Sequence, residues 1–136
     1  MKEGFLDLIG ATRTASGQLR LTVTEQLLNA NGTMHGGVSA TLVDTAAGFG
    51  ARSSLPAGSI LSTIQLSVMY VAPARVGDVI VTTSETLHVS VRHALATATL
   101  VRESDGAVLA HGDASFAVKP PAAPNNSSAQ QRTGHP

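Results

Sequence analysis

The chain has 136 residues, and its nine basic side chains balance nine acidic ones, so the formal net charge is zero at pH 7. This length allows one domain with a core, and the balanced charge does not suggest nucleic acid or an anionic membrane as the main partner. The sequence contains no cysteine, which excludes disulfides, a thiolate nucleophile and a cysteine-ligated metal. Because Asp7 interrupts the short apolar patch of residues 1–9, neither a signal peptide nor a membrane span is expected, and the chain is predicted to be cytoplasmic.

The first predicted elements are a short amphipathic turn or helix at residues 4–10 and a half-buried strand at residues 18–25. In this strand, Leu19, Leu21 and Val23 alternate with polar residues. A loop rich in Gly and Asn then leads into a helix predicted for residues 37–51. One buried face of the helix is predicted from the 3.6-residue periodicity of its apolar positions: Val38, Leu42, Thr45, Ala46 and Phe49.

Four further strands are predicted at residues 59–71, 79–88, 93–102 and 108–118. In the first of them, alternation places Ile64, Leu66, Val68 and Tyr70 on one face, and Thr63, Gln65 and Ser67 on the other. A strand, a helix and four consecutive strands favour an α+β fold, in which helices cover one face of an antiparallel sheet. The domain is expected to span residues 1–119. Residues 120–136 lack apolar periodicity, so they are predicted to form a disordered tail.

Asp44 is the one acidic residue of the predicted helix, and it points roughly away from the apolar face. An ionised carboxylate in weakly polar surroundings is costly unless it is paired or hydrogen-bonded. Two interpretations are open: a structural acid bonded to a neighbour, and a general base or nucleophile that faces a pocket. The second is favoured because the residues one turn away are small and leave space beside the carboxylate: Ala40, Thr41, Ala47 and Gly48.

Gly36 and Gly37 lie at or near the start of the same predicted helix. Free backbone amides and the helix dipole stabilise negative charge at this position, and glycine lets a substrate oxygen approach the backbone closely. A helix start lined by amides, followed two turns later by an acid, is suited to attack on a carbonyl group.

These residues resemble a known signature. The spacing Asn29-x-x-Gly32-x-x-His35-Gly36-Gly37, followed by Leu42-x-Asp44, is similar to that of hotdog-fold acyl-CoA thioesterases, in the branch named for phenylacetate degradation that also contains mammalian fatty acyl-CoA hydrolases. The segment Thr63-Ile64-Gln65-Leu66-Ser67-Val68-Met69-Tyr70-x-x-Pro73 resembles the second block of that family. The resemblance covers most of residues 1–119. It implies a sheet wrapped around one long helix, and a homodimer that pairs into a homotetramer with active sites between subunits.

The resemblance also implies a role for each matching residue. The acid at Asp44 activates water against the thioester or attacks it directly, and the amide at Gly36 polarises the carbonyl. Asn29 helps to orient the carbonyl or the water, and the Thr63 hydroxyl helps to hold the water. His35 is assigned to fixing the loop in preference to proton transfer, because Asp44 already supplies a base. No cofactor is implied.

A hairpin is implied to contact the coenzyme A part of the substrate, through Val89, Ser90, Arg92 and His93, together with Gly37 at the helix start. Arg92 and His93 would pair with a phosphate. The alternative is a solvated hairpin tip without a ligand. The histidines of the chain show no HxH or HxxxH spacing, so no metal site is expected.

The expected function is therefore hydrolysis of an acyl-CoA to a carboxylic acid and coenzyme A, with an aryl or a fatty acyl group. The alternative is a non-catalytic module that binds acyl-CoA on the same fold. The intact set of Asn29, Gly36, Asp44 and Thr63 favours the enzyme. A hotdog dehydratase or hydratase would need an acid–His pair on a loop that this sequence lacks.

Overall fold

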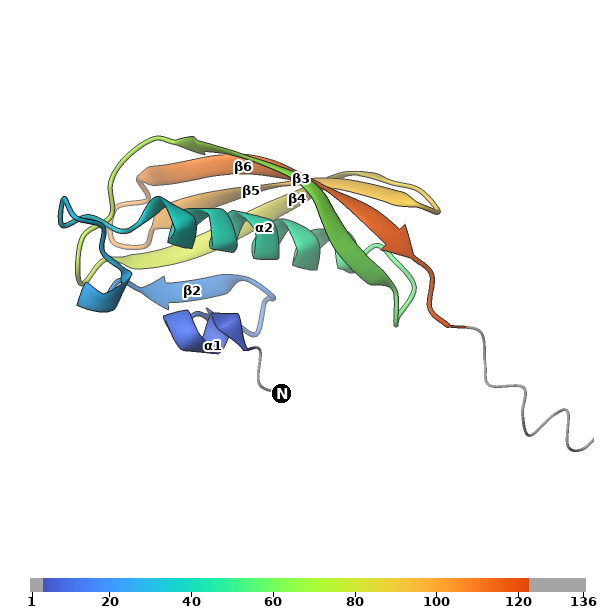
Figure 1. Cartoon of the computed structure of the whole chain (residues 1–136), viewed down its shortest axis with the longest axis horizontal. Coiled ribbons are helices and arrows are strands. Elements are labelled where there is room, and N and C mark those ends of the chain that lie inside the picture. The colour runs from blue at the N-terminus through green and yellow to red at the C-terminus, as the bar shows by residue number, and fades with distance from the viewer. Residues whose placement is uncertain (1–3, 123–136) are drawn as a thin grey trace, which may run out of the picture.

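Six antiparallel strands curve over one long helix in the computed structural model (Figure 1), which describes residues 4–122. In chain order the elements are α1 (Phe5–Ile9), β1 (Thr12–Arg13), β2 (Leu19–Thr22), the 3-10 helix η1 (Glu25–Leu27), α2 (Gly36–Arg52), β3 (Ile60–Tyr70), β4 (Val79–Val89), β5 (His93–Arg102) and β6 (Val108–Lys119). The strand order across the sheet is β1-β2-β4-β5-β6-β3. Residues 123–136, which make up most of the predicted tail, lie outside the described residues.

The predicted α+β architecture is confirmed. The predicted helix is α2, which is one residue longer at each end, and the four strands after it begin and end within one residue of the prediction. The strand predicted at residues 18–25 is shorter, because β2 ends at Thr22 and η1 follows. β1 and η1 were not predicted, since two paired residues or a single helical turn are too short to show periodicity.

α2 is buried over a wider arc than its predicted apolar face, because the sheet curves around it. Of the predicted face, Val38, Leu42 and Ala46 are buried, whereas Thr45 and Phe49 are half-buried. A second flank of the helix is fully buried as well, at Val43, Ala47 and Ala51. The expectation that Ala47 leaves space beside Asp44 was therefore wrong, since the curved sheet covers that side of the helix too.

β3 contains an extra residue that changes which side chains face α2. Thr63 pairs with Phe116 of β6 and Gln65 pairs with Ser115, so Ile64 is left over as a β-bulge. The extra residue shifts the alternation, so odd-numbered side chains before the bulge and even-numbered side chains after it point to the same face of the sheet. Thr63 therefore faces α2 together with Leu66. The prediction that Thr63 and Leu66 lie on opposite faces was wrong, because strict alternation does not allow for the bulge.

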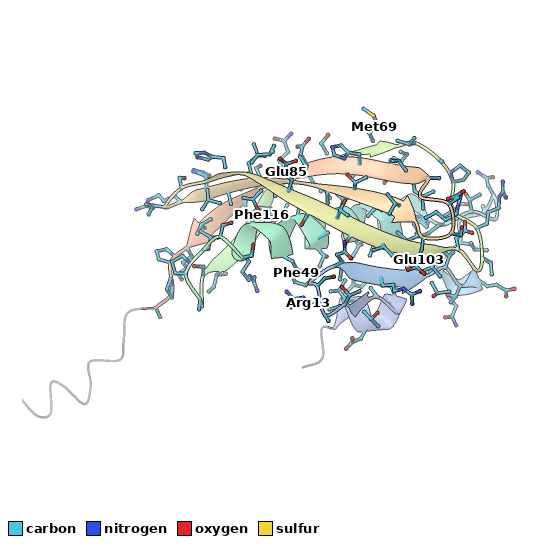
Figure 2. All side chains as sticks on the ribbon, turned by 180° about the vertical axis from the view of Figure 1, so that it is seen from behind. Arg13, Phe49, Met69, Glu85, Glu103 and Phe116 are labelled. Carbon is cyan, nitrogen blue, oxygen red and sulfur yellow. The ribbon has the colours of Figure 1, made fainter. Side chains whose placement is uncertain are left out.

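Arg13 links the short edge strand β1 to α2. Its guanidinium lies over the Phe49 ring, 3.7 Å from the ring centroid (Figure 2). A cation–π contact at an exposed site contributes about 0.5–1 kcal/mol, and it covers a ring that the sheet leaves half-buried. On the opposite side of the sheet, Met69 and Glu85 point away from α2 (Figure 2).

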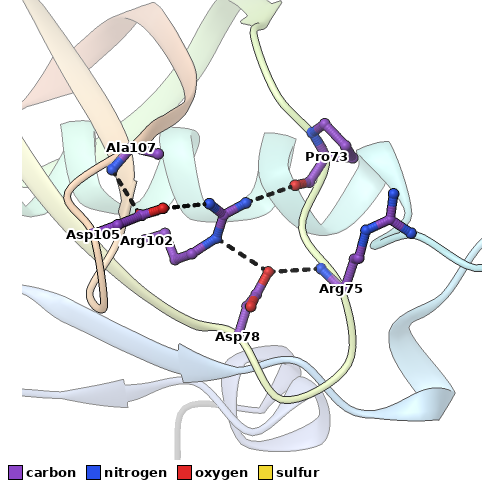
Figure 3. Close-up of polar contacts among 6 residues, drawn as sticks. All are labelled: Pro73, Arg75, Asp78, Arg102, Asp105 and Ala107. Atoms are coloured by element: carbon purple, nitrogen blue, oxygen red, sulfur yellow. Dashed lines mark hydrogen bonds and ion pairs between the residues drawn. The ribbon is translucent and has the colours of Figure 1, made fainter.

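Arg102 holds the turn between β3 and β4 against the turn between β5 and β6 (Figure 3). Its guanidinium donates to Asp78 at 3.3 Å, to Asp105 at 2.9 Å and to the Pro73 carbonyl at 3.2 Å. The Ala107 amide also donates to Asp105, and these two donors hold the pKa of Asp105 below its usual value. This network fixes the backbone around Pro73, which lines a pocket at the start of α2.

Candidate active site

Asp44 accepts a hydrogen bond from the edge strand. The Thr63 hydroxyl donates to Asp44 Oδ1 at 2.7 Å. Asp44 is half-buried and Thr63 is exposed, so the pair is accessible to solvent. Within residues 4–122 the Asp44 carboxylate has no further hydrogen bond, which leaves its second oxygen able to accept from water.

The backbone on both sides of Gly36 is held by short hydrogen bonds. The His35 amide donates to the Leu27 carbonyl at 2.8 Å, and the Val38 amide donates to the His35 carbonyl at 2.9 Å. The Gly37 amide donates to Nδ1 of His35 at 2.8 Å, so the His35 ring caps α2. The Gly36 amide lies in the first helical turn, where no earlier carbonyl of the helix can receive it. In the described part of the chain it is free to bind a ligand.

The two glycine amides assigned to the substrate therefore differ. Gly36 presents a free N–H at the positive end of the α2 dipole, which favours an anionic oxygen. Gly37 is engaged by His35. This bond is of the loop-fixing kind that the sequence suggested for His35, and it requires an Nδ1 atom without a proton.

Tyr70 contacts the same glycine from the end of β3. Its hydroxyl donates to the Gly36 carbonyl at 2.6 Å. A Cβ atom added to Gly36 would lie 3.1 Å from the Tyr70 hydroxyl and 3.2 Å from the ring. The sequence placed Tyr70 on a strand face without a role. Alternation shows a face but not the curvature that brings the end of this strand to the start of α2.

Asn29 organises the loop that precedes α2. Its side-chain oxygen accepts from the amides of Asn31 at 2.9 Å and Thr33 at 3.1 Å, and its Nδ2 donates to the Thr33 hydroxyl at 3.0 Å. These bonds make an Asx turn, which is the ordinary role of Asn in a loop. The second N–H of the side-chain amide has no hydrogen-bond partner among residues 4–122.

An open pocket of about 420 Å³ lies beside this loop. Asn29, Gly36 and Tyr70 line it together with the turn after β3. Its other lining residues are small or apolar: Thr33, Met34, Ser39, Val71, Ala72, Pro73, Ala74 and Leu109. The sequence predicted Asn29 and Gly36 as site residues, and both border this pocket, whereas Asp44 and Thr63 do not.

The β4–β5 hairpin holds the residues assigned to coenzyme A. Ser90 closes the turn, because its hydroxyl accepts from the His93 amide at 3.2 Å and its own amide donates to the His93 carbonyl at 2.8 Å. Arg92 and His93 are exposed. Val89 and Ser90 line a second pocket of about 280 Å³ with the segment that follows α2, and the hairpin projects past that end of the helix (Figure 1).

The predicted site residues thus form three groups along α2. Asn29, His35 and both glycines lie at its start, Asp44 and Thr63 near its middle, and the hairpin tip at its end. Gly36 and Asp44 are eight residues apart in one helix, which is about 12 Å along its axis. This separation is long for one thioester group to contact the Gly36 amide and a water molecule held by Asp44 of the same chain.

Neither a metal site nor a membrane-spanning helix is found in the part of the chain that the structure describes. No three His, Asp or Glu side chains gather there in an arrangement that could hold a metal ion. None of the helices between residues 4 and 122 combines the length and the apolar character needed to cross a membrane.

A curved antiparallel sheet wrapped around one long helix defines the hotdog fold. In this chain the helix carries Asp44 and, at its start, the free amide of Gly36. The family model described as the thioesterase superfamily matches residues 31–109, and the chain belongs to this family. The match contains the helix start, Asp44 and Thr63, together with the hairpin.

Named relatives agree with this assignment. Acyl-coenzyme A thioesterase 13 of Mus musculus is 33% identical over 92 residues, which cover 68% of this chain and 65% of that protein. A Bacillus halodurans protein solved with coenzyme A superposes with a TM-score of 0.69 and 28% identity, over 74% of this chain and 70% of that chain. Zebrafish thioesterase superfamily member 2 superposes with a TM-score of 0.71 and 26% identity, over 87% of this chain and 88% of that chain. The chain spans 56–65% of the length of the curated relatives it matches.

Proposed function

We propose that this protein is an acyl-CoA thioesterase, which hydrolyses R–CO–S–CoA with water to a carboxylic acid and free coenzyme A. The observation that carries the proposal is the 2.7 Å hydrogen bond from Thr63 to Asp44. The Thr63 oxygen can still accept from a water molecule, and the second Asp44 oxygen can accept from the same water. This water is then oriented next to a base. The coenzyme A bound by the Bacillus halodurans protein and the activity named for the mouse relative support a thioester substrate.

In the mechanism, Asp44 takes a proton from the water while the water oxygen attacks the thioester carbon. The negative charge that develops on the carbonyl oxygen is stabilised by the Gly36 amide at the start of α2. The C–S bond then breaks, and the thiolate of coenzyme A takes the proton from Asp44. In a second route Asp44 attacks the carbonyl carbon itself, the C–S bond breaks and coenzyme A leaves as the thiolate. Water then hydrolyses the resulting anhydride to the carboxylic acid and the Asp44 carboxylate, and the proton released in this step goes to the thiolate.

We assign the two halves of this machinery to two subunits, because about 12 Å separates Gly36 from Asp44 within one α2. The edge strand β3 supports a dimer. Among the described strands it pairs with β6 alone, so its other side offers eleven residues of unpaired backbone. Ile60, Ile64 and Met69 are exposed along it.

Symmetry fixes where the two helices would cross. If two α2 helices run antiparallel, and Gly36 of each meets the partner subunit's Asp44, the two-fold axis passes the residue midway between them, Ala40. Its neighbours on the same stripe, Gly37 and Thr41, are also small, so the helices can approach closely. The hairpin at the end of one α2 would then lie near the partner subunit's Asn29, which groups all three clusters around one substrate.

A panel of aryl and fatty acyl-CoA substrates tests the proposal. Thiol release, followed with a disulfide-exchange dye, should be detected for at least one member and should identify the acyl group. Calorimetry with the same compounds provides the second measurement. Tight binding of acyl-CoA without thiol release from any member would assign the protein to the non-catalytic binding module instead.

A further inference from the structure

We propose that Tyr70 is a positioning residue, which holds the Gly36 amide in the orientation that binds the thioester oxyanion. This inference rests on the thioesterase function proposed above. Tyr70 is the last residue of β3, where it pairs with Ala110 of β6. Its hydroxyl donates to the Gly36 carbonyl at 2.6 Å, which is at the short end of the range for such bonds.

The peptide group between Gly36 and Gly37 is held at both ends. Its oxygen accepts from Tyr70 at 2.6 Å, and its N–H donates to Nδ1 of His35 at 2.8 Å. A peptide group is planar, so two bonds to its opposite ends fix its orientation. The peptide before it is held as well, because its oxygen accepts from Val38 at 2.9 Å. The free Gly36 N–H belongs to this preceding peptide, which is joined at the Gly36 Cα to the peptide that Tyr70 and His35 hold.

Glycine at position 36 needs this support from Tyr70, and it also leaves room for the Tyr70 ring. Without a side chain, Gly36 can adopt many backbone conformations, so its amide direction is weakly determined by local sterics. The missing side chain also gives the Tyr70 ring room, since an added Cβ would lie 3.1–3.3 Å from three Tyr70 atoms. The ring therefore fills the space against the glycine while its hydroxyl fixes the peptide.

Tyr70 is not assigned as a catalytic hydrogen-bond donor, because its hydroxyl hydrogen is already donated within the protein. A phenol has a single O–H donor, and Tyr70 gives it to Gly36. Its ring lines the 420 Å³ pocket, so removal of the whole side chain would alter substrate contacts as well. Removal of the hydroxyl alone isolates the positioning role.

Tyr70→Phe is the first test, because it keeps the ring and removes the donor. Loss of an oxyanion donor itself costs about 10²–10³ in kcat, so we expect loss of its support to lower kcat by roughly 5- to 20-fold, with KM unchanged. Asp113→Asn is the control, since Asp113 is exposed on the outer face of the sheet, and it should alter neither constant. A higher KM with unchanged kcat would assign Tyr70 to substrate binding and overturn the proposal.

A double-mutant cycle tests whether Tyr70 and His35 act on one peptide. Residues that share a target couple, so the combined Tyr70→Phe and His35→Ala variant should lose less kcat than the product of the two single losses. Losses that simply multiply would show that the two side chains act on separate groups, and would overturn the proposal.

Amide hydrogen exchange provides a measurement that does not depend on turnover. In the ¹⁵N-labelled protein the Gly37 amide should exchange several-fold faster in Tyr70→Phe than in wild type, and at the wild-type rate in Asp113→Asn. If wild type hydrolyses no acyl-CoA, the thioesterase function fails, and the exchange rates still decide whether Tyr70 holds the peptide. Equal rates in a folded Tyr70→Phe protein would overturn the positioning role.

Discussion

Thr63 faces Asp44 because β3 carries one extra residue, Ile64, between two stretches that pair regularly with β6. Without the bulge, Thr63 and Leu66 would lie on opposite faces of the sheet. Bulges commonly redirect a side chain next to an active site, and here the redirected hydroxyl reaches a carboxylate on the central helix. The hydrogen bond to the candidate base thus depends on an irregularity in the edge strand.

Asp44→Asn should leave the fold intact and lower kcat by about 10²–10⁴, which is the usual contribution of a positioned base. The amide keeps the size of the carboxylate and can still accept from Thr63, but it cannot take a proton from water. Asp113→Asn on the outer face of the sheet is the control and should retain full turnover. Near-normal turnover of Asp44→Asn would remove this residue from the mechanism.

Thr63→Val and Thr63→Ser separate the hydroxyl from the shape of the side chain. A hydrogen bond to a charged group is worth roughly 1.5–3 kcal/mol, so Thr63→Val should lower kcat by about 10- to 100-fold. Thr63→Ser retains the donor to Asp44 and should keep most of the turnover. Equal losses in the two variants would show that the hydroxyl is not what matters at this position.

Gly112→Ala should destabilise the sheet where β6 passes over α2. An added Cβ would collide with the Ser67 carbonyl and approach the Val43 side chain to 2.8 Å. Overpacking of this kind costs about 1–3 kcal/mol, which urea unfolding would detect as a lower free energy of unfolding. Ala117→Ser, on the exposed face of the same strand, is the control. An unchanged free energy of unfolding in Gly112→Ala would mean that the β3 backbone and the Val43 side chain shift without cost.

Acid should weaken the turn that Arg102 holds. The Ala107 amide and Arg102 hold the pKa of Asp105 below its usual value. A carboxyl group of this kind stabilises the fold above its unfolded pKa of about 4, and this stabilisation is lost as pH falls through the lower folded value. Wild type should therefore lose more stability than Asp105→Asn between about pH 5 and pH 2. Parallel stability curves for the two proteins in this range would contradict the assignment.

Much of the fold follows from local patterns in the sequence. The period-2 alternation in residues 79–118 and the 3.6-residue period around Leu42 predict the main strands and the helix, because each element buries one face. The fully buried Ala47 was not predicted, since burial on a second flank depends on how far the sheet curves.

Less of the candidate site could be predicted from such patterns. Asp44 and Gly36 stood out because an acid and paired glycines are unusual in a helix with a buried face. The resemblance assigned Thr63 to the same site as Asp44, but the residue pattern alone predicted neither their hydrogen bond nor the contact of Tyr70 with Gly36. Both depend on the bulge and on the curvature of an edge strand, and neither feature leaves a period in the sequence.

The composite site between two subunits is the central claim, and refolding of mixed variants tests it most directly. Asn29→Ala and Asp44→Ala proteins, each inactive alone, are unfolded together in equal amounts and refolded. About half of the dimers should be hybrids, and each hybrid should contain one intact site out of two, so about a quarter of wild-type activity should return. Activity that stays at the level of the separate variants, despite confirmed subunit mixing, would place the whole site within one chain and contradict the account.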